Sequence, residues 1–187
     1  VTLMPAPQDT AIDFIRKDVS DSPQIQVSIE NIRPALLSTT VGIDGVQVQT
    51  IEHLLAAASG LDIDNLLVEI DAPELPALDG SAQSFVSLML EAGIVSQDRR
   101  RSYLKVVRPI EVIEGDKRIA IRPASKSSVT YTIDYAHPLI GRQTYDYDWS
   151  HDAFVEDIAP ARTFGFLQND QSIICKQSIL PLKRHHI

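Results

Sequence analysis

The chain has 187 residues, of which 44% are hydrophobic and 22% are charged, and these ordinary globular values exclude a largely disordered protein. The formal net charge of −8 argues against binding to the phosphate backbone of nucleic acids as the main function. The single Cys175 excludes an internal disulfide and favours a reducing, cytoplasmic compartment, and no apolar run is long enough to predict an integral membrane segment.

Short extended segments open the chain. They are separated by Pro, Asp and Ser, which favour turns, and the third of them alternates apolar and polar residues like a half-buried strand. Strands are predicted at Val1–Met4, Ile12–Arg16, Ile25–Ile29 and Val46–Val48. Because the first of them begins at Val1 itself, we expect the natural start of the protein to lie upstream.

The stretch from Thr50 to Gly60 predicts a helix, because a Thr at the N-cap position precedes an alanine-rich body and a closing glycine. On a helical wheel the stripe that faces a core consists of Ile51, Leu54, Leu55 and Ala58. His53 points almost opposite to this stripe, beside two alanines that let another element approach closely. We therefore expect the helix to be covered on both sides, with Glu52 and His53 facing a cleft.

A strand followed by a helix comes next. Strand Asn65–Ile70 leads through a proline-bracketed loop to a second helix near Ala82–Ala92, and Asp79-Gly80-Ser81 is interpreted as a turn and cap before that helix. The arginine-rich Gln97–Ser102 is interpreted as a linker. The elements predicted beyond it are strands at Leu104–Val107, Ile110–Ile113, Arg118–Ile121, Val129–Tyr135 and Thr163–Leu167, a turn at Gly115-Asp116 and a short helix at Ala153–Ile158.

This order of elements predicts an α+β fold of two similar two-layer α/β domains, the second of them incomplete. The first domain is placed at residues 1–98 and the second at residues 99–187. From about residue 168 the chain has no helical or strand period, so a poorly ordered tail is expected there.

Glu52 and His53 are the candidate chemical groups. In the first turn of a helix the dipole disfavours an imidazolium and favours a carboxylate. A neutral imidazole is the form that binds a metal ion, and an ionised carboxylate is the form that accepts a proton. A Glu-His pair also arises by chance, and the His-Glu-x-x-His zinc signature is absent, so this helix supplies at most one imidazole ligand. On the residues alone, metal chemistry and chance both stay open.

Three motifs together resemble one known family, the UDP-3-O-acyl-N-acetylglucosamine deacetylases. Thr50–Ala57 followed by Gly60–Asn65 is similar to the first zinc motif of that family. Glu69–Pro76 and Leu78–Ala82 resemble the loop after this motif, and Ala161–Phe166 resembles a signature in the second domain. The motifs occur in the order of the family and at about its spacing, and the resemblance runs from Val1 to about Phe166.

The resemblance implies two domains whose helices pack between the sheets, with the site at the junction. It also implies a Zn²⁺-activated water that attacks the acetamide of a small-molecule substrate, UDP-3-O-acyl-N-acetylglucosamine, in lipid A synthesis. By matched position His53 would be a zinc ligand and Glu52 the general base that takes the proton of the water. Thr163 would help to stabilise the tetrahedral oxyanion.

The resemblance assigns apolar residues to the substrate as well. Phe164 would line the sugar pocket, and Leu36 and Leu37 would border the entrance for the acyl chain, although packing in a core is an alternative for each. The remaining zinc ligands and the general acid of the family are not recognisable, and Arg184-His185 is too weak a match to carry a ligand. The chain is therefore interpreted as truncated at both ends. The competing hypothesis is a catalytically inactive remnant with a binding or structural role.

Overall fold

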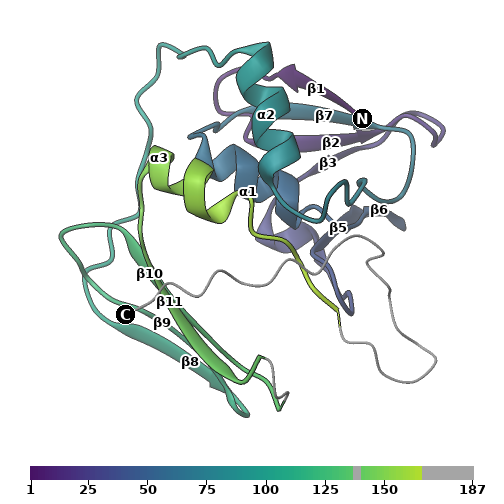
Figure 1. The fold of residues 1–187 in the computed structure, drawn as a ribbon. Coiled ribbons are helices and arrows are strands. Elements are labelled where there is room, and N and C mark those ends of the chain that lie inside the picture. The colour runs from purple at the N-terminus through teal and green to yellow at the C-terminus, as the bar shows by residue number, and fades with distance from the viewer. Residues whose placement is uncertain (137–139, 166–187) are drawn as a thin grey trace. The chain divides into compact units, whose positions relative to one another are not determined.

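Figure 1 shows a computed structural model of the chain, which describes residues 1–136 and 140–165. Strands and helices occur together in it, which confirms the predicted α+β class. The chain divides into two compact units: the first holds Val1–Ser96 and resumes at Phe154, and the second is Gln97–Ala153. None of the helices in the described ranges has the length and apolar character needed to span a bilayer.

A four-stranded sheet forms the centre of the first unit. In spatial order its strands are β1 (Thr2–Pro5), β7 (Leu66–Ile70), β2 (Ile12–Arg16) and β3 (Gln24–Gln26). β2 and β7 are parallel, whereas β1 and β3 run antiparallel to their neighbours. Phe14 lies in one row with Ile25 and Val68, and all three side chains are fully buried. One face of this sheet therefore supplies much of the core.

Two helices complete this core. They are α1 (Glu52–Gly60) and α2 (Gln83–Ala92), which contact each other and lie side by side in Figure 1. Leu54 and Ala57 of α1 are fully buried, as is Val86 of α2. The small side chain of Ala57 lets a neighbouring element approach α1 closely.

A second, antiparallel sheet of the first unit leads directly to α1. After a 3₁₀ turn, η1 (Ile29–Asn31), its strands are β4 (Ile32–Arg33), β5 (Thr40–Ile43) and β6 (Val46–Val48). The β5–β6 hairpin turns at Asp44 and Gly45, whose φ angles of 48° and 82° are the positive values that a tight two-residue turn requires. Only three residues separate the end of β6 from the start of α1.

Arg16, at the end of β2, ties the two sheets of the first unit together. Its buried guanidinium donates hydrogen bonds to the carboxylate of Asp18 and to the backbone carbonyl oxygen of Gln47 in β6. The hydrogen bond to Asp18 raises the pKa of Arg16 above its ordinary value, so the buried group stays charged. A buried charge held by a carboxylate and a carbonyl oxygen is adequately paired.

The second unit consists of two β-hairpins. The first pairs β8 (Ile110–Glu114) with β9 (Lys117–Ile121), and the second pairs β10 (Ser128–Asp134) with β11 (Arg142–Asp148). Cross-strand hydrogen bonds join Thr130 to Asp146 and Thr132 to Thr144 on one face of the second hairpin. The short helix predicted near residue 153 is present as α3 (His151–Ala153) followed by a π-helical turn, η2 (Phe154–Ile158).

Three strand predictions need correction. Leu104–Val107 is not a strand, because no strand among the described residues pairs with this segment. Its residues Leu104 and Val107 are largely exposed. The strand predicted at Ile25–Ile29 ends at Gln26, and Ile29 instead begins η1. Residues 163–165 have no regular structure, while the end of that predicted strand and the predicted tail lie outside the described residues. Apolar composition alone does not identify a pairing partner.

The prediction of the first helix is confirmed, but its two caps are wrong. Ile51 rather than Thr50 is at the N-cap position, and the Thr50 hydroxyl donates to the carboxylate of Glu74. Gly60 is the last helical residue and is not left-handed, so it does not terminate the helix as a C-cap glycine does. A side chain at Gly60 would instead overlap the ring of Phe154, so this glycine is required for packing.

Candidate functional site

Glu52 and His53 occupy the first turn of α1, as predicted, and both are half-buried. The Glu52 Oε2 atom accepts a hydrogen bond of 2.8 Å from the backbone N–H of Thr39. The carbonyl oxygen of Thr39 accepts in turn from the N–H of Ile51, at 3.3 Å. Thr39 thus holds both the carboxylate of Glu52 and the backbone at the start of the helix, which leaves Oε1 of Glu52 for another contact.

The predicted acyl-chain residues, Leu36 and Leu37, lie on the same segment as Thr39. Leu36 and Leu37 precede Thr39 by two or three residues, and their side chains are 94% and 72% exposed. Exposure on this scale is incompatible with the alternative that these two leucines fill the core in this structure. They form an accessible apolar surface on the segment that hydrogen-bonds to Glu52.

Thr50 holds an unusual backbone conformation two residues before Glu52. Its φ of 59° lies in the left-handed region, where a β-branched residue is strained. Backbone hydrogen bonds from Gln49 N to Pro73 O and from Leu75 N to Gln49 O fix the strand before it, at 2.9 and 3.1 Å. The Thr50 hydroxyl adds a bond of 2.6 Å to the Glu74 Oε1 atom. The loop of residues 73–75 therefore holds the entry to α1.

Thr50→Val is expected to lower the free energy of unfolding by about 1 kcal/mol, because valine keeps the β-branch but removes the hydrogen bond to Glu74. Urea unfolding of the variant and the unchanged chain measures the difference. The matched control is Thr50→Ser, which keeps the hydroxyl and should remain within a few tenths of the original value. Equal losses in the two variants would show that the hydroxyl has no part in holding this turn.

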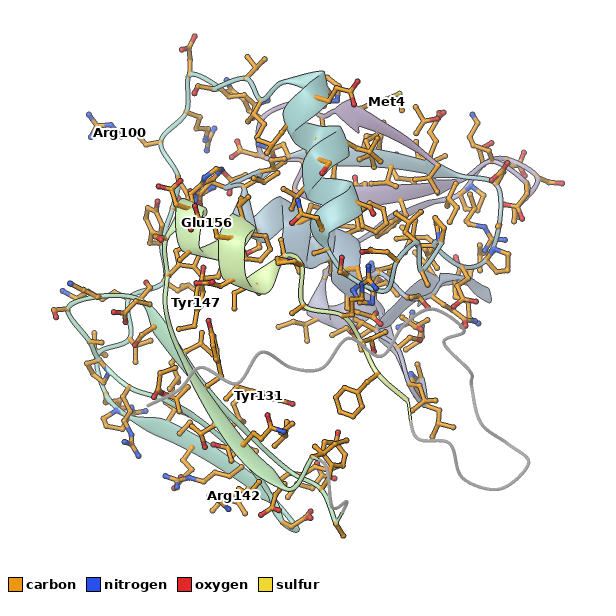
Figure 2. All side chains as sticks on the ribbon, in the orientation of Figure 1. Met4, Arg100, Tyr131, Arg142, Tyr147 and Glu156 are labelled. Atoms are coloured by element: carbon orange, nitrogen blue, oxygen red, sulfur yellow. The ribbon has the colours of Figure 1, made fainter. Side chains whose placement is uncertain are left out.

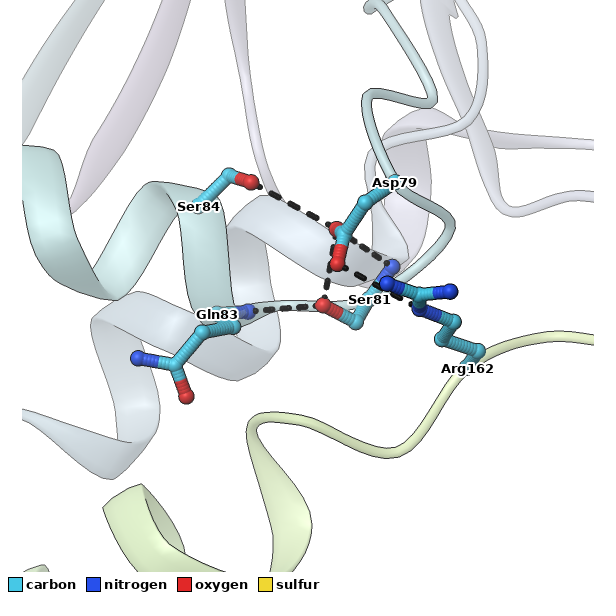
Figure 3. Close-up of polar contacts among 5 residues, drawn as sticks. All are labelled: Asp79, Ser81, Gln83, Ser84 and Arg162. Carbon is cyan, nitrogen blue, oxygen red and sulfur yellow. Dashed lines mark hydrogen bonds and ion pairs between the residues drawn. The ribbon is translucent and has the colours of Figure 1, made fainter. Parts of the chain in front are cut away.

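A second cluster gathers around the loop before α2 (Figure 3). The Oδ1 atom of Asp79 accepts hydrogen bonds from the backbone N–H and the hydroxyl of Ser81, at 3.2 and 2.8 Å. It also accepts from the Ser84 hydroxyl at 3.4 Å. The Ser81 hydroxyl in turn accepts from the N–H of Gln83, the first residue of α2. The interpretation of Asp79-Gly80-Ser81 as a turn is confirmed, but its interpretation as the helix cap is wrong, because Ala82 is the N-cap residue of α2 and Ser81 precedes it.

Arg162 and Thr163 dock on this loop. The backbone N–H of Thr163 donates to the carbonyl oxygen of Gly80 at 2.7 Å, and Arg162 Nε lies 3.5 Å from Asp79 Oδ2. Burial opposes the charged form of Asp79, but the hydrogen bonds from Ser81 and the charge of Arg162 together lower its pKa below the ordinary value. Asp79 is therefore ionised at neutral pH, and its ion pair weakens only in acid, below the ordinary pKa of an aspartate.

The predicted site residues thus fall into two groups. The first surrounds the start of α1 and contains Glu52, His53, Leu36 and Leu37. The second contains Thr163 and Phe164, and the Phe164 side chain is 49% exposed. Within residues 1–136 and 140–165, no hydrogen bond or ion pair joins Thr163 to Glu52 or His53. Their assembly into one catalytic centre stays a prediction.

His53, the predicted zinc ligand, has no set of companion ligands among the described residues. Its imidazole is half-buried, and among the described residues neither ring nitrogen takes part in a hydrogen bond. No group of three His, Cys, Asp or Glu side chains in that part of the chain lies close enough to hold a metal ion. Since a catalytic zinc usually takes three protein ligands, the described residues fit one ligand of such a site and not the complete set.

Thr39, Glu74 and Arg162 are structurally important residues that the sequence analysis did not single out. Thr39 acts through its backbone, which no side-chain pattern reveals. Arg162 lies in the Ala161–Phe166 motif and Asp79 in the Leu78–Ala82 motif, so the complementary charges of two motifs were a usable signal. Glu74 lies inside the quoted loop motif, but its partner is the strained Thr50, and strain is not visible in a sequence.

Comparison with known proteins adds a family to this geometry. The family model described as LpxC, UDP-3-O-acyl N-acetylglycosamine deacetylase, matches residues 1–180. The UDP-3-O-acyl-N-acetylglucosamine deacetylase of Bdellovibrio bacteriovorus is 42% identical over 173 residues, covering 92% of this chain and 57% of that protein. The deacetylase of the same name from Shewanella oneidensis is 44% identical over 172 residues, covering 90% and 56% respectively. The chain spans little more than half the length of these relatives.

Proposed function

The chain belongs to the UDP-3-O-acyl N-acetylglycosamine deacetylase family, and from that membership we propose that it carries part of a zinc-dependent deacetylase of lipid A biosynthesis. The proposed reaction is hydrolysis of the N-acetyl group of UDP-3-O-acyl-N-acetylglucosamine, the compound that appears in the names of its relatives. The observation that carries the proposal is the Glu52–His53 pair in the first turn of α1, within the region that the family model matches.

In this proposal Glu52 is the general base. Its Oε2 atom is held by the N–H of Thr39, so the carboxylate has a fixed direction before substrate binds. A pre-oriented base does not have to be ordered during the reaction, and this lowers the activation barrier. Thr163 would stabilise the negative charge that develops on the carbonyl oxygen of the acetamide, and the Gly80 carbonyl oxygen fixes its backbone.

His53 would provide one ligand to zinc, and the other ligands would come from outside the described residues. Zinc in such a site supplies a water molecule of lowered pKa and polarises the carbonyl group that is attacked. Leu36 and Leu37 would contact the acyl chain, and Phe164 would contact the sugar. All three side chains are accessible, as contact with a substrate requires.

The organisation of the whole enzyme is also part of the proposal. We propose a first deacetylase domain at residues 1–98, a second at residues 99–187, and a cytoplasmic location for the protein. The alternative function is a catalytically inactive remnant, which is favoured by one observation: the described residues provide a single candidate zinc ligand.

Activity of a hybrid enzyme tests the proposed function. In this hybrid, residues 1–165 of the chain replace the part of the Shewanella oneidensis deacetylase that they match. We expect it to release acetate from UDP-3-O-acyl-N-acetylglucosamine, to lose this activity with a chelator and to regain it with Zn²⁺. A hybrid that folds and binds zinc, but releases no acetate, would favour the inactive remnant.

Zinc binding by the chain itself gives a separate prediction. With one matched ligand the 187-residue chain should bind Zn²⁺ weakly, because affinity depends on assembling several ligands in one geometry. Equilibrium dialysis of the chain and of His53→Ala makes the measurement, with His151→Ala as a control at an exposed histidine. Tight binding of one zinc per chain that survives His53→Ala would refute our placement of the metal site.

A further inference from the structure

The segment that carries Thr163 contacts the loop before α2 through two consecutive residues. Thr163 donates its backbone N–H to Gly80 O at 2.7 Å, and Arg162 pairs with Asp79 at 3.5 Å. Consecutive residues of one segment thus contact consecutive residues of another. Residues 161–165 have no regular structure, so contacts of individual residues, these two among them, fix the direction of the segment in place of a helix or strand ladder.

The loop that receives the segment is rigid. Gly80 and Leu78 both have positive φ angles, 80° and 51°, and the Ser81 side chain is fully buried. Three hydrogen bonds from Ser81 and Ser84 hold the Oδ1 atom of Asp79 (Figure 3), while its Oδ2 atom is the one nearest Arg162. The loop therefore presents a carbonyl oxygen and a carboxylate oxygen in fixed positions, and both are occupied by the same incoming segment.

A single backbone hydrogen bond on an irregular segment leaves rotation about that bond free. A second contact one residue away removes this freedom, because the two acceptors on the loop are themselves fixed. The Arg162 and Asp79 side chains are each about one-third exposed, so their ion pair contributes little to the stability of the fold. We therefore expect the ion pair to affect the orientation of Thr163 more than the stability of the fold.

We infer that Arg162 and Asp79 are positioning residues for Thr163: their ion pair sets the orientation in which the Thr163 backbone meets Gly80, and so aims the oxyanion-stabilising residue. This inference rests on the proposed function for the role of Thr163. It assigns neither Arg162 nor Asp79 a contact with substrate or metal.

Amide hydrogen exchange in the 187-residue chain tests the positioning independently of activity. The Thr163 amide is protected by Gly80 O, and in Arg162→Gln it should exchange about 10-fold faster, while the amides of β7 stay unchanged. Arg162→Lys keeps a positive charge and should restore most of the protection. The control is Arg142→Gln, which breaks another exposed ion pair, of 3.3 Å, between β10 and β11. Unchanged exchange at Thr163 in Arg162→Gln would overturn the inference.

Steady-state kinetics of the hybrid enzyme provide a second test of the positioning role. Arg162→Gln and Asp79→Asn should each lower kcat about 10- to 100-fold with KM, zinc content and the urea midpoint unchanged, and the double variant should lose no more than either single one. A fall in the urea midpoint beyond that of Arg142→Gln, or an unchanged kcat, would overturn the positioning role. If the unaltered hybrid is inactive, the proposed function fails, and the exchange experiment still decides whether the ion pair orients Thr163.

Discussion

Glu52→Gln in the hybrid enzyme is expected to lower kcat by about 10²–10⁴-fold, the usual effect of losing a general base. Glutamine keeps the size of the side chain, and its carbonyl oxygen can still accept the N–H of Thr39, so the start of α1 should stay in place. It has no lone pair basic enough to take a proton from water. The loss should therefore appear in kcat, with KM and zinc content close to those of the unchanged hybrid.

His53→Ala is the companion variant, and it should behave differently. Because His53 is the proposed zinc ligand, its removal should lower both metal content and rate. Metal analysis of the purified proteins and steady-state kinetics separate the two variants, and Glu91→Gln on the exposed side of α2 is the control for loss of a carboxylate. If Glu52→Gln lost as much zinc as His53→Ala, the roles of base and ligand would have to be reassigned.

The periodic elements of the first unit were the predictable part of the fold. β2, β6, β7 and both helices match their predicted positions within about two residues, because each has a buried face whose spacing is visible in the sequence. The prediction of the apolar stripe of α1 was less accurate. Ala57, expected on a second face that another element covers, is fully buried, whereas Leu55, expected in the core stripe, is only half-buried. A helix packed on more than one side does not have one apolar stripe.

The non-periodic contacts were not predictable. β5 was missed because its sequence, Thr-Val-Gly-Ile, contains a glycine and does not alternate apolar and polar residues. The positive φ of Thr50 contradicts the usual preference of threonine, and only the three-dimensional arrangement of residues 73–75 explains it. The candidate site shows the same division: the motifs contain Glu52, His53 and Thr163, but they do not reveal the backbone contact of Thr39 with Glu52 or the pairing of Asp79 with Arg162.

The contact between Gly60 and Phe154 joins the two predicted halves of the site. Phe154 begins η2, which leads to Thr163, and its side chain is only 3% exposed. Gly60 ends α1, the helix that carries Glu52 and His53, and a Cβ atom there would overlap the aromatic ring. The missing side chain of this glycine is therefore what allows the returning segment to pack on the helix.

Gly60→Ala is accordingly expected to destabilise the protein by about 1–3 kcal/mol, although alanine is the better helix former, because the buried ring must shift. Phe154→Ala should cost about 3–5 kcal/mol by leaving a cavity. Urea unfolding measures both, and Ser59→Ala, at an exposed position of the same helix, is the control that should change stability little.

A size exchange makes the test specific to this contact. Phe154→Leu shortens the side chain that meets residue 60, so Gly60→Ala should cost less in that background than in the unchanged chain, and the difference is the coupling between the two positions. Amide exchange at Thr163 should rise in Gly60→Ala, because a displaced Phe154 loosens the segment that ends on Gly80. Additive losses in the double variant, or a Gly60→Ala variant as stable as Ser59→Ala, would mean that this packing does not join the Thr163 segment to the helix that carries Glu52 and His53.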